Sequence, residues 1–147
     1  MKKQILFITA VLGSLLIITA SASAQVEDMV KEGEQLMEAS QYLIDQGQIM
    51  EKCTCANRAA MIDQGNQMVK KGTDVLASGM MMTTSDGRFG TQLVGKKIEG
   101  AGKLLIKKGE QADPLTDKDK EEVNKLGKDM VSFGNLKLQI GKHMGGE

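Results

Sequence analysis

From about residue 26 onward, apolar residues recur three, four and seven places apart along the chain. Leu36-Met37 follows Gly33 at this spacing, Leu43-Ile44 follows Ser40, and Leu105-Ile106 follows Gly102. Such spacing puts the apolar side chains on one face of a helix, whereas a strand would require strict alternation. The sequence therefore predicts an all-α chain with helices near residues 26–50, 58–82, 88–112 and 118–144.

Glycine holds a fixed place in this pattern. Eleven of the seventeen glycines, with Ser40, form triplets with seven-residue spacing. Successive triplets start 32, 30 and 32 residues apart, so the chain contains four repeats of about 32 residues. Ser40 fills the one place in the pattern that lacks glycine. The predicted helix-packing glycines are Gly33, Gly47, Gly65, Gly72, Gly79, Gly95, Gly102, Gly109, Gly127, Gly134 and Gly141.

A glycine inside a helix costs about 1 kcal/mol relative to alanine, so eleven of them cost about 10 kcal/mol. That cost is comparable to the whole net stability of an ordinary domain. Close packing of helix backbones is an effect large enough to offset it. Short connections then favour an antiparallel up-down four-helix bundle. The alternative is two long hairpins whose glycine faces close only in a dimer.

Turn and capping residues separate the predicted helices. Asn57 is placed to cap the second helix, and residues 83–87 (TTSDG) offer Ser85 and Asp86 as caps for the third. The dipeptide at residues 113–114 (DP) ends the third helix, and Thr116 with Asp119 has the spacing of a capping box. Gly87 lies in a predicted turn, so its substitution is expected to be milder than substitution at Gly72 or Gly102.

The first 24 residues have the pattern of a signal peptide. Two lysines precede an apolar run from Ile5 to Ala20, and Ala22-Ser23-Ala24 resembles a signal peptidase site. We therefore expect residues 25–147 to form a single exported helical-bundle domain, most simply periplasmic. An uncleaved signal anchor is the alternative.

Charge and composition exclude several functional classes. The chain has 19 basic and 19 acidic residues, one His and no Trp, so it lacks a general basis for binding nucleic acid. Lysines concentrate on the third predicted helix, where pairing with an acidic helix is a simpler explanation than polyanion binding; they are Lys96, Lys97, Lys103, Lys107 and Lys108. No nucleophile elbow, phosphate loop or paired-histidine motif is present, which indicates a protein that is not an enzyme.

Cys53 and Cys55 lie between the first two predicted helices. Export would place them in an oxidising compartment that favours disulfides. A bridge within the chain, a link between chains, and a metal or redox site are all compatible with this spacing, and the first two are favoured. A disulfide between the two residues would close a small strained ring, which is easily reduced.

An antiparallel bundle would bring the start of the first helix, the turn after the second and the end of the fourth to one pole. Soft ligands suited to Cu(I) would gather there: Met29, Met80, Met81, Met82, His143 and Met144. Met29 near the start and His143 near the end of the bundle resemble the axial haem ligands of the cytochrome b562 family. That resemblance implies a haem-binding bundle. The alternative is that methionine fills core space beside glycine.

The leading functional hypothesis is an exported, non-enzymatic bundle with a structural or protein-association role, with no cofactor. It would pack against itself or a protein partner through its glycine-lined helix faces. The second hypothesis is a periplasmic protein that binds copper or b-type haem at the methionine and histidine pole.

Overall fold

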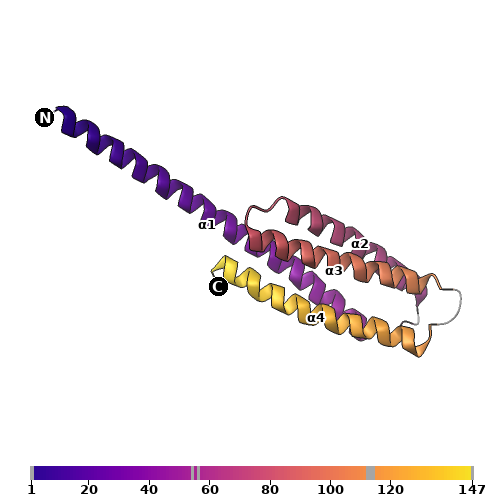
Figure 1. Cartoon of the computed structure of the whole chain (residues 1–147). Helices are drawn as coiled ribbons and strands as arrows, with labels where there is room; N and C mark the ends of the chain where they lie inside the picture. Colours follow the sequence, from indigo (N-terminus) through magenta and orange to yellow (C-terminus); the bar gives the residue numbers. More distant parts are fainter. Residues whose placement is uncertain (1, 54, 56, 112–114, 147) are drawn as a thin grey trace.

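The computed structural model contains four α-helices that pack against one another as a four-helix bundle (Figure 1). It describes residues 2–53, 55, 57–111 and 115–146, with side chains from residue 22 onward. The helices are α1 (Lys2–Glu51), α2 (Arg58–Met80), α3 (Ser85–Gly109) and α4 (Asp117–Gly145). No strand occurs in these described ranges, so the all-helical prediction is confirmed.

Side-chain caps set where three of the helices begin. The Asn57 side chain accepts a hydrogen bond from the Ala60 amide (3.1 Å), as predicted. Thr116 and Asp119 form the predicted capping box at the start of α4. At α3 the cap is Thr84 rather than Ser85 or Asp86, so the helix begins three residues earlier than predicted. The predicted stop at residues 113–114 lies outside the described residues.

Helix α1 is much longer than predicted, because it begins at Lys2 instead of near residue 26. No proline or turn interrupts it before Glu51. Its first part extends away from the bundle (Figure 1), and residues 22–29 are exposed. From residue 22 onward, where side chains are described, no helical stretch is long and apolar enough to span a membrane.

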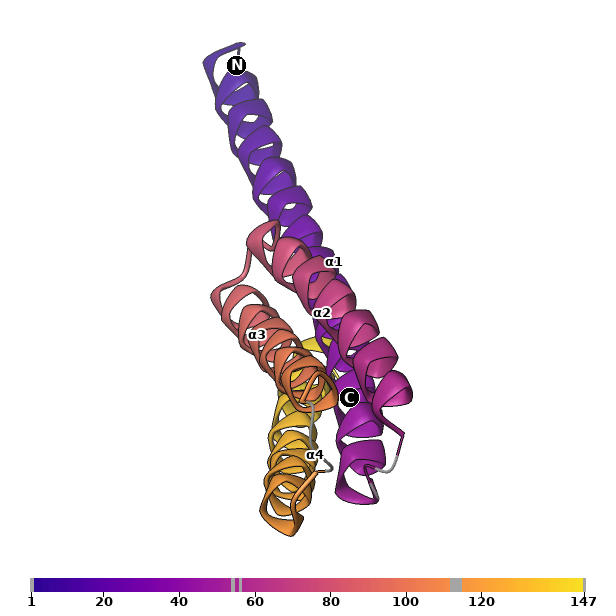
Figure 2. The same ribbon diagram turned by 90° about the vertical axis from the view of Figure 1, so that its right-hand side faces the viewer.

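The bundle is built as two close helix pairs. Helix α1 lies along α4 and α2 lies along α3, and these two interfaces hold most of the close approaches between helices. Fewer contacts join α1 to α3 and α3 to α4. Figure 2 shows α2 and α3 together above α4, with α1 passing behind. The pairing joins the first helix to the last, and the two middle helices to each other.

A continuous apolar core fills the space between the pairs. All four helices contribute fully buried side chains, including Leu43 from α1, Met68 from α2, Ile98 from α3 and Met130 from α4. Unbranched methionines supply much of this core, where they fit beside glycine.

Candidate functional site

Facing small residues bring α1 and α4 together. A Cβ atom added to Gly33 would lie 2.7 Å from the Gly141 carbonyl oxygen, and one added to Gly47 would lie 2.7 Å from that of Gly127. Between them, a Cβ at Gly134 would lie 3.1 Å from the carbonyl oxygen of Ser40. Real Cβ atoms essentially never come within 3.0 Å of such atoms, so α1 and α4 pack at a separation that only small residues permit.

Helices α2 and α3 meet in the same way. A Cβ at Gly65 would lie 2.7 Å from the Gly102 carbonyl oxygen, and a Cβ at Gly95 would lie 2.9 Å from that of Gly72. In both pairs the residue number rises along one helix as it falls along the other, so the paired helices are antiparallel.

All the glycines of the seven-residue pattern are buried, and so is Ser40. The faces they line were expected to pack against a second chain or within the bundle, and in this structure each faces another helix of the same chain. Any contact between chains through these faces would require a helix pair to separate first. Gly87 was predicted to lie in a turn, but it lies in the first turn of α3 and is buried. A Cβ there would lie 2.6 Å from a Glu32 carboxylate oxygen.

A buried carboxylate fixes the turn between α2 and α3 to α1. Glu32, only 7 % exposed, accepts hydrogen bonds from the amide and hydroxyl groups of both Thr83 and Thr84. Burial alone would raise the pKa of the Glu32 carboxyl, but these hydrogen bonds outweigh burial and hold the pKa below its ordinary value. Sequence reasoning missed this residue, because Glu32 shows no motif and its partners lie more than 50 positions away.

The predicted methionine and histidine pole is divided between two cavities. Met81 and Met82 line one cavity, next to α1, whereas His143 and Met144 line another, next to Asp86. The Met82 sulfur accepts a hydrogen bond from the Thr91 hydroxyl (3.2 Å), and Met144 is buried in the core.

Four of the six predicted ligands are exposed on the surface: Met29, Met80, Met81 and His143. The described residues contain no group of three or more His, Cys, Asp or Glu side chains placed to hold a metal ion. Copper or haem binding by the methionine and histidine pole stays a prediction.

Cys53 and Cys55 lie side by side in the connection between α1 and α2. Their sulfur atoms are 2.7 Å apart and both are free thiols in this structure. A disulfide within the chain or between chains stays a prediction. Cys55 is buried and has a positive φ of 50°, in the left-handed region that non-glycine residues rarely occupy. Cys53 is half-buried and borders an open cavity of about 460 Å³.

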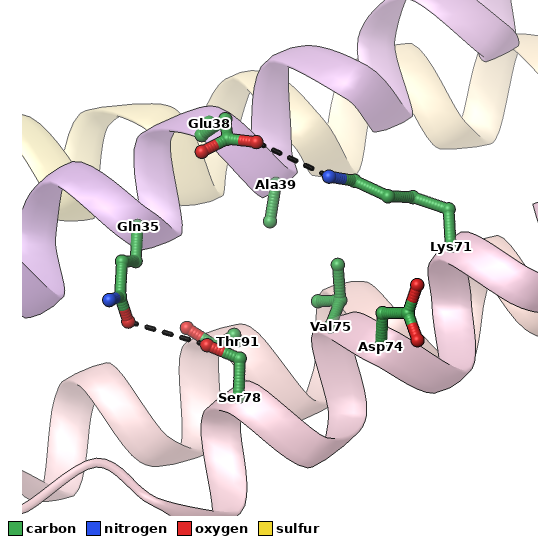
Figure 3. A pocket seen from close by; sticks show the side chains of 8 residues that line it. All are labelled: Gln35, Glu38, Ala39, Lys71, Asp74, Val75, Ser78 and Thr91. Atoms are coloured by element: carbon green, nitrogen blue, oxygen red, sulfur yellow. Dashed lines mark hydrogen bonds and ion pairs between the residues drawn. The ribbon is translucent and has the colours of Figure 1, made fainter.

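A further cavity, of about 210 Å³, lies between α1 and α2 (Figure 3). Lys71 bridges it to Glu38 (3.2 Å), and the Ser78 hydroxyl donates to the Gln35 side-chain oxygen (3.3 Å). Because this hydroxyl is bound to an amide rather than to a base, it is not arranged as a nucleophile. The cavity is a polar seam between the two helix pairs.

The lysines of α3 have several different environments. Lys108 is buried and bonds both Asp119 (2.5 Å) and Glu122 (2.7 Å) of α4, and hydrogen bonds to these carboxylates raise the pKa of Lys108. The Lys97 ammonium lies 5.2 Å from the centre of the Phe133 ring. At least these two lysines face α4.

Large exposed apolar side chains gather on the outer face of α3 and α4. Asp86 lines a cavity with His143, and Lys97 lies over Phe133, so this part of α3 runs alongside this part of α4. Between those contacts lie exposed apolar residues of both helices. We call this set the α3–α4 apolar surface: Phe89, Leu93, Leu136 and the half-buried Ile140.

Known protein families, curated proteins and solved structures contain no match to this chain.

Proposed function

We propose that the protein is an exported, non-enzymatic up-down helical bundle with a structural role, and that it acts by associating with a second copy of itself. In this proposal the four glycine repeats hold each bundle together from within. The observation that carries the association is the α3–α4 apolar surface, because exposed apolar patches mark interaction sites.

The same chain offers a helical segment suited to this surface. Beyond its contacts with α4, α1 continues through a stretch in which Val26 and Met29 are exposed at helical spacing. The stretch would remain in the mature chain after cleavage behind Ala24. An amphipathic helix that lays its apolar face into a groove is a common mode of recognition.

Charge complementarity favours this occupant over an unrelated partner. Glu27 and Asp28 accompany Val26 and Met29, whereas Lys97 and Lys137 lie over the Phe133 ring beside the α3–α4 apolar surface. Opposite charges on two docking surfaces steer association and set its register. The two contacts would be reciprocal, as in the isologous interface of a symmetric dimer.

Light scattering of the chain purified from its native host tests this proposal. We expect a dimer that dissociates on dilution, and each of Val26→Lys and Phe89→Lys is expected to weaken it about tenfold, or about 1.4 kcal/mol. Val26 and Phe89 represent the two halves of the contact. A chain that stays monomeric up to about 100 µM would contradict the proposal.

Ile49→Lys is the matched control. Ile49 is 53 % exposed, similar to Val26 at 56 %, but lies at the opposite end of the bundle. We expect this variant to dimerise like the unaltered chain. Equal weakening by all three substitutions would show that the effect is a general one of added charge.

Two further measurements address export and the metal alternative. N-terminal sequencing of the secreted or periplasmic chain should start at Gln25 if cleavage follows Ala24. Metal analysis and an absorption spectrum of the same material test the second hypothesis. Stoichiometric copper that is lost in His143→Ala, or a haem absorption band, would replace the structural role with metal or haem binding.

A further inference from the structure

We propose that Cys53 and Cys55 form a thiol–disulfide exchange site, in which Cys53 attacks a disulfide in an apolar polypeptide segment and Cys55 resolves the mixed disulfide. The site is separate from the α3–α4 apolar surface and does not depend on the association proposed above, but it would add a redox activity to a protein otherwise proposed to be non-enzymatic.

Two hydrogen bonds distinguish the thiols. The Cys55 amide donates to the Cys53 sulfur at 3.1 Å, and the two sulfur atoms are 2.7 Å apart. Burial, together with the hydrogen bond and charge of Cys53, raises the pKa of Cys55 to about 12. Cys55 therefore keeps its proton before the resolving step, and the Cys53 sulfur, which accepts the hydrogen bond from the Cys55 amide, is assigned as the attacking atom.

Accessibility assigns the same roles. Both cysteines line the same open cavity, but Cys55 is only 6 % exposed and packs in the apolar core, whereas Cys53 is half-buried. The thiolate is the nucleophile in exchange, and only an accessible sulfur meets an incoming disulfide.

The backbone around Cys53 is held by α4. The Asn124 side chain of α4 turns its amide nitrogen toward the connection between α1 and α2. In this orientation it donates to the Met50 carbonyl oxygen at 2.9 Å and to the Cys53 carbonyl oxygen at 3.3 Å. These bonds keep the Cys53 backbone in place while its sulfur reacts.

The neighbouring cavity indicates the substrate. Its walls combine the apolar side chains of Ile49, Ala60 and Met61 with the polar side chains of Lys52, Asn57 and Gln64. The apolar part of these walls suits a polypeptide disulfide with an apolar neighbour.

The exchange balances in two steps. The Cys53 thiolate attacks one sulfur of the foreign disulfide, forming a mixed disulfide, and the other foreign sulfur leaves and takes up a proton. Cys55 then loses its proton and attacks the Cys53 sulfur, closing the Cys53–Cys55 disulfide and releasing the second foreign thiol. The dithiol is oxidised by two electrons and the foreign disulfide is reduced to two thiols.

The attack of Cys55 on the mixed disulfide becomes easier once Cys53 has reacted. The thiolate charge of Cys53, which helps to raise the pKa of Cys55, is absent from the mixed disulfide. Because a ring closed by Cys-x-Cys is small and easily reduced, the same steps also run in reverse.

Trapping the mixed disulfide tests the assigned roles. The reduced protein is mixed with a peptide disulfide that carries leucine beside each cysteine, and the products are weighed by mass spectrometry. We expect the unaltered chain to end with an intrachain disulfide and no adduct. Cys55→Ala should stop at one peptide adduct on Cys53, and Cys53→Ala should react at least about tenfold more slowly. Equal adducts on both variants, or disulfide-linked dimers of the unaltered chain, would overturn the proposal.

Two controls complete the experiment. Limited alkylation of the unaltered protein should label Cys53 at least about tenfold faster than Cys55, which tests the roles without a substitution. Oxidised glutathione should react more slowly than the peptide, and Ile49→Ser should slow the peptide alone. Equal rates for peptide and glutathione would refute the polypeptide substrate.

Discussion

Gly100 and Gly102 lie two positions apart in α3 but have opposite surroundings. A Cβ at Gly102 would lie 2.6 Å from the Gly65 carbonyl oxygen, whereas nothing lies within 4 Å of a Cβ at Gly100. Gly102 belongs to the seven-residue pattern and Gly100 does not. The pattern therefore separates a glycine that permits close packing from one that only weakens its helix.

Alanine substitutions should make this difference measurable. We expect Gly102→Ala to lower the free energy of unfolding by about 1–3 kcal/mol through overpacking, and Gly102→Leu to lower it further. Gly100→Ala should instead raise it by up to about 1 kcal/mol, because alanine is the better helix former. Urea denaturation measures both. Stabilisation by both alanines would contradict the close packing of α2 on α3.

Glu32 should make stability depend on pH. Because the folded pKa lies below the ordinary value, its contribution is present above the ordinary pKa of about 4.5 and is lost as the pH falls through the folded value. Glu32→Gln should lower the free energy of unfolding at pH 7 by about 1–3 kcal/mol and flatten its decline in acid. Glu34→Gln, at an exposed neighbouring position, serves as the control. Parallel pH profiles for the unaltered and Glu32→Gln chains would show that the carboxylate contributes nothing.

At the scale of elements, local signals predicted the existence of the helices and two of their caps. Asn57 and Thr116 were predictable because a cap bonds residues only three positions away. The Thr84 cap of α3 also bonds a residue three positions away, Gly87 (3.1 Å), but the adjacent Ser85 and Asp86 offered equivalent local caps. The hydrogen bond that singles out Thr84 goes to Glu32 of a distant helix. The full length of α1 was also missed. The prediction divided the chain at the expected cleavage site after Ala24, but no residue there ends a helix, so α1 continues through it.

The cap of α4 can be tested by itself. Thr116→Ala removes the oxygen that accepts a hydrogen bond from the Asp119 amide (3.2 Å), and should lower the free energy of unfolding by about 1 kcal/mol. Thr73→Ala is the matched control, because the exposed Thr73 hydroxyl bonds only within its own helix, to the Val69 carbonyl oxygen. Thermal melting measures the loss of stability in each variant. Equal losses from the two substitutions would argue against the cap.

At the scale of the whole molecule, periodicity predicts which face of each helix is buried but not which helix it meets. All four helices carry the same small-residue spacing, so several pairings would satisfy it equally. In the structure α1 pairs with α4 and α2 with α3. Contacts such as Glu32 with Thr84 and Lys108 with Asp119 then hold the two pairs against each other, and no local sequence pattern predicts them.

The shared core should make the two helix pairs unfold together. Residues of all four helices meet in one cluster, and Tyr42, the only tyrosine, packs against it from α1. We expect Tyr42 fluorescence and far-ultraviolet circular dichroism to report the same urea midpoint. Different midpoints would mean that the α1–α4 pair melts independently of the α2–α3 pair.

The facing glycines also restrict how the length of the molecule can change. A step of fourteen residues along α1, from Gly33 to Gly47, is matched by an equal step back along α4, from Gly141 to Gly127. Inserting a single residue in either helix would turn side chains into the partner backbone. Two antiparallel helices of this kind can be lengthened or shortened only by whole heptads, added to or removed from both at once.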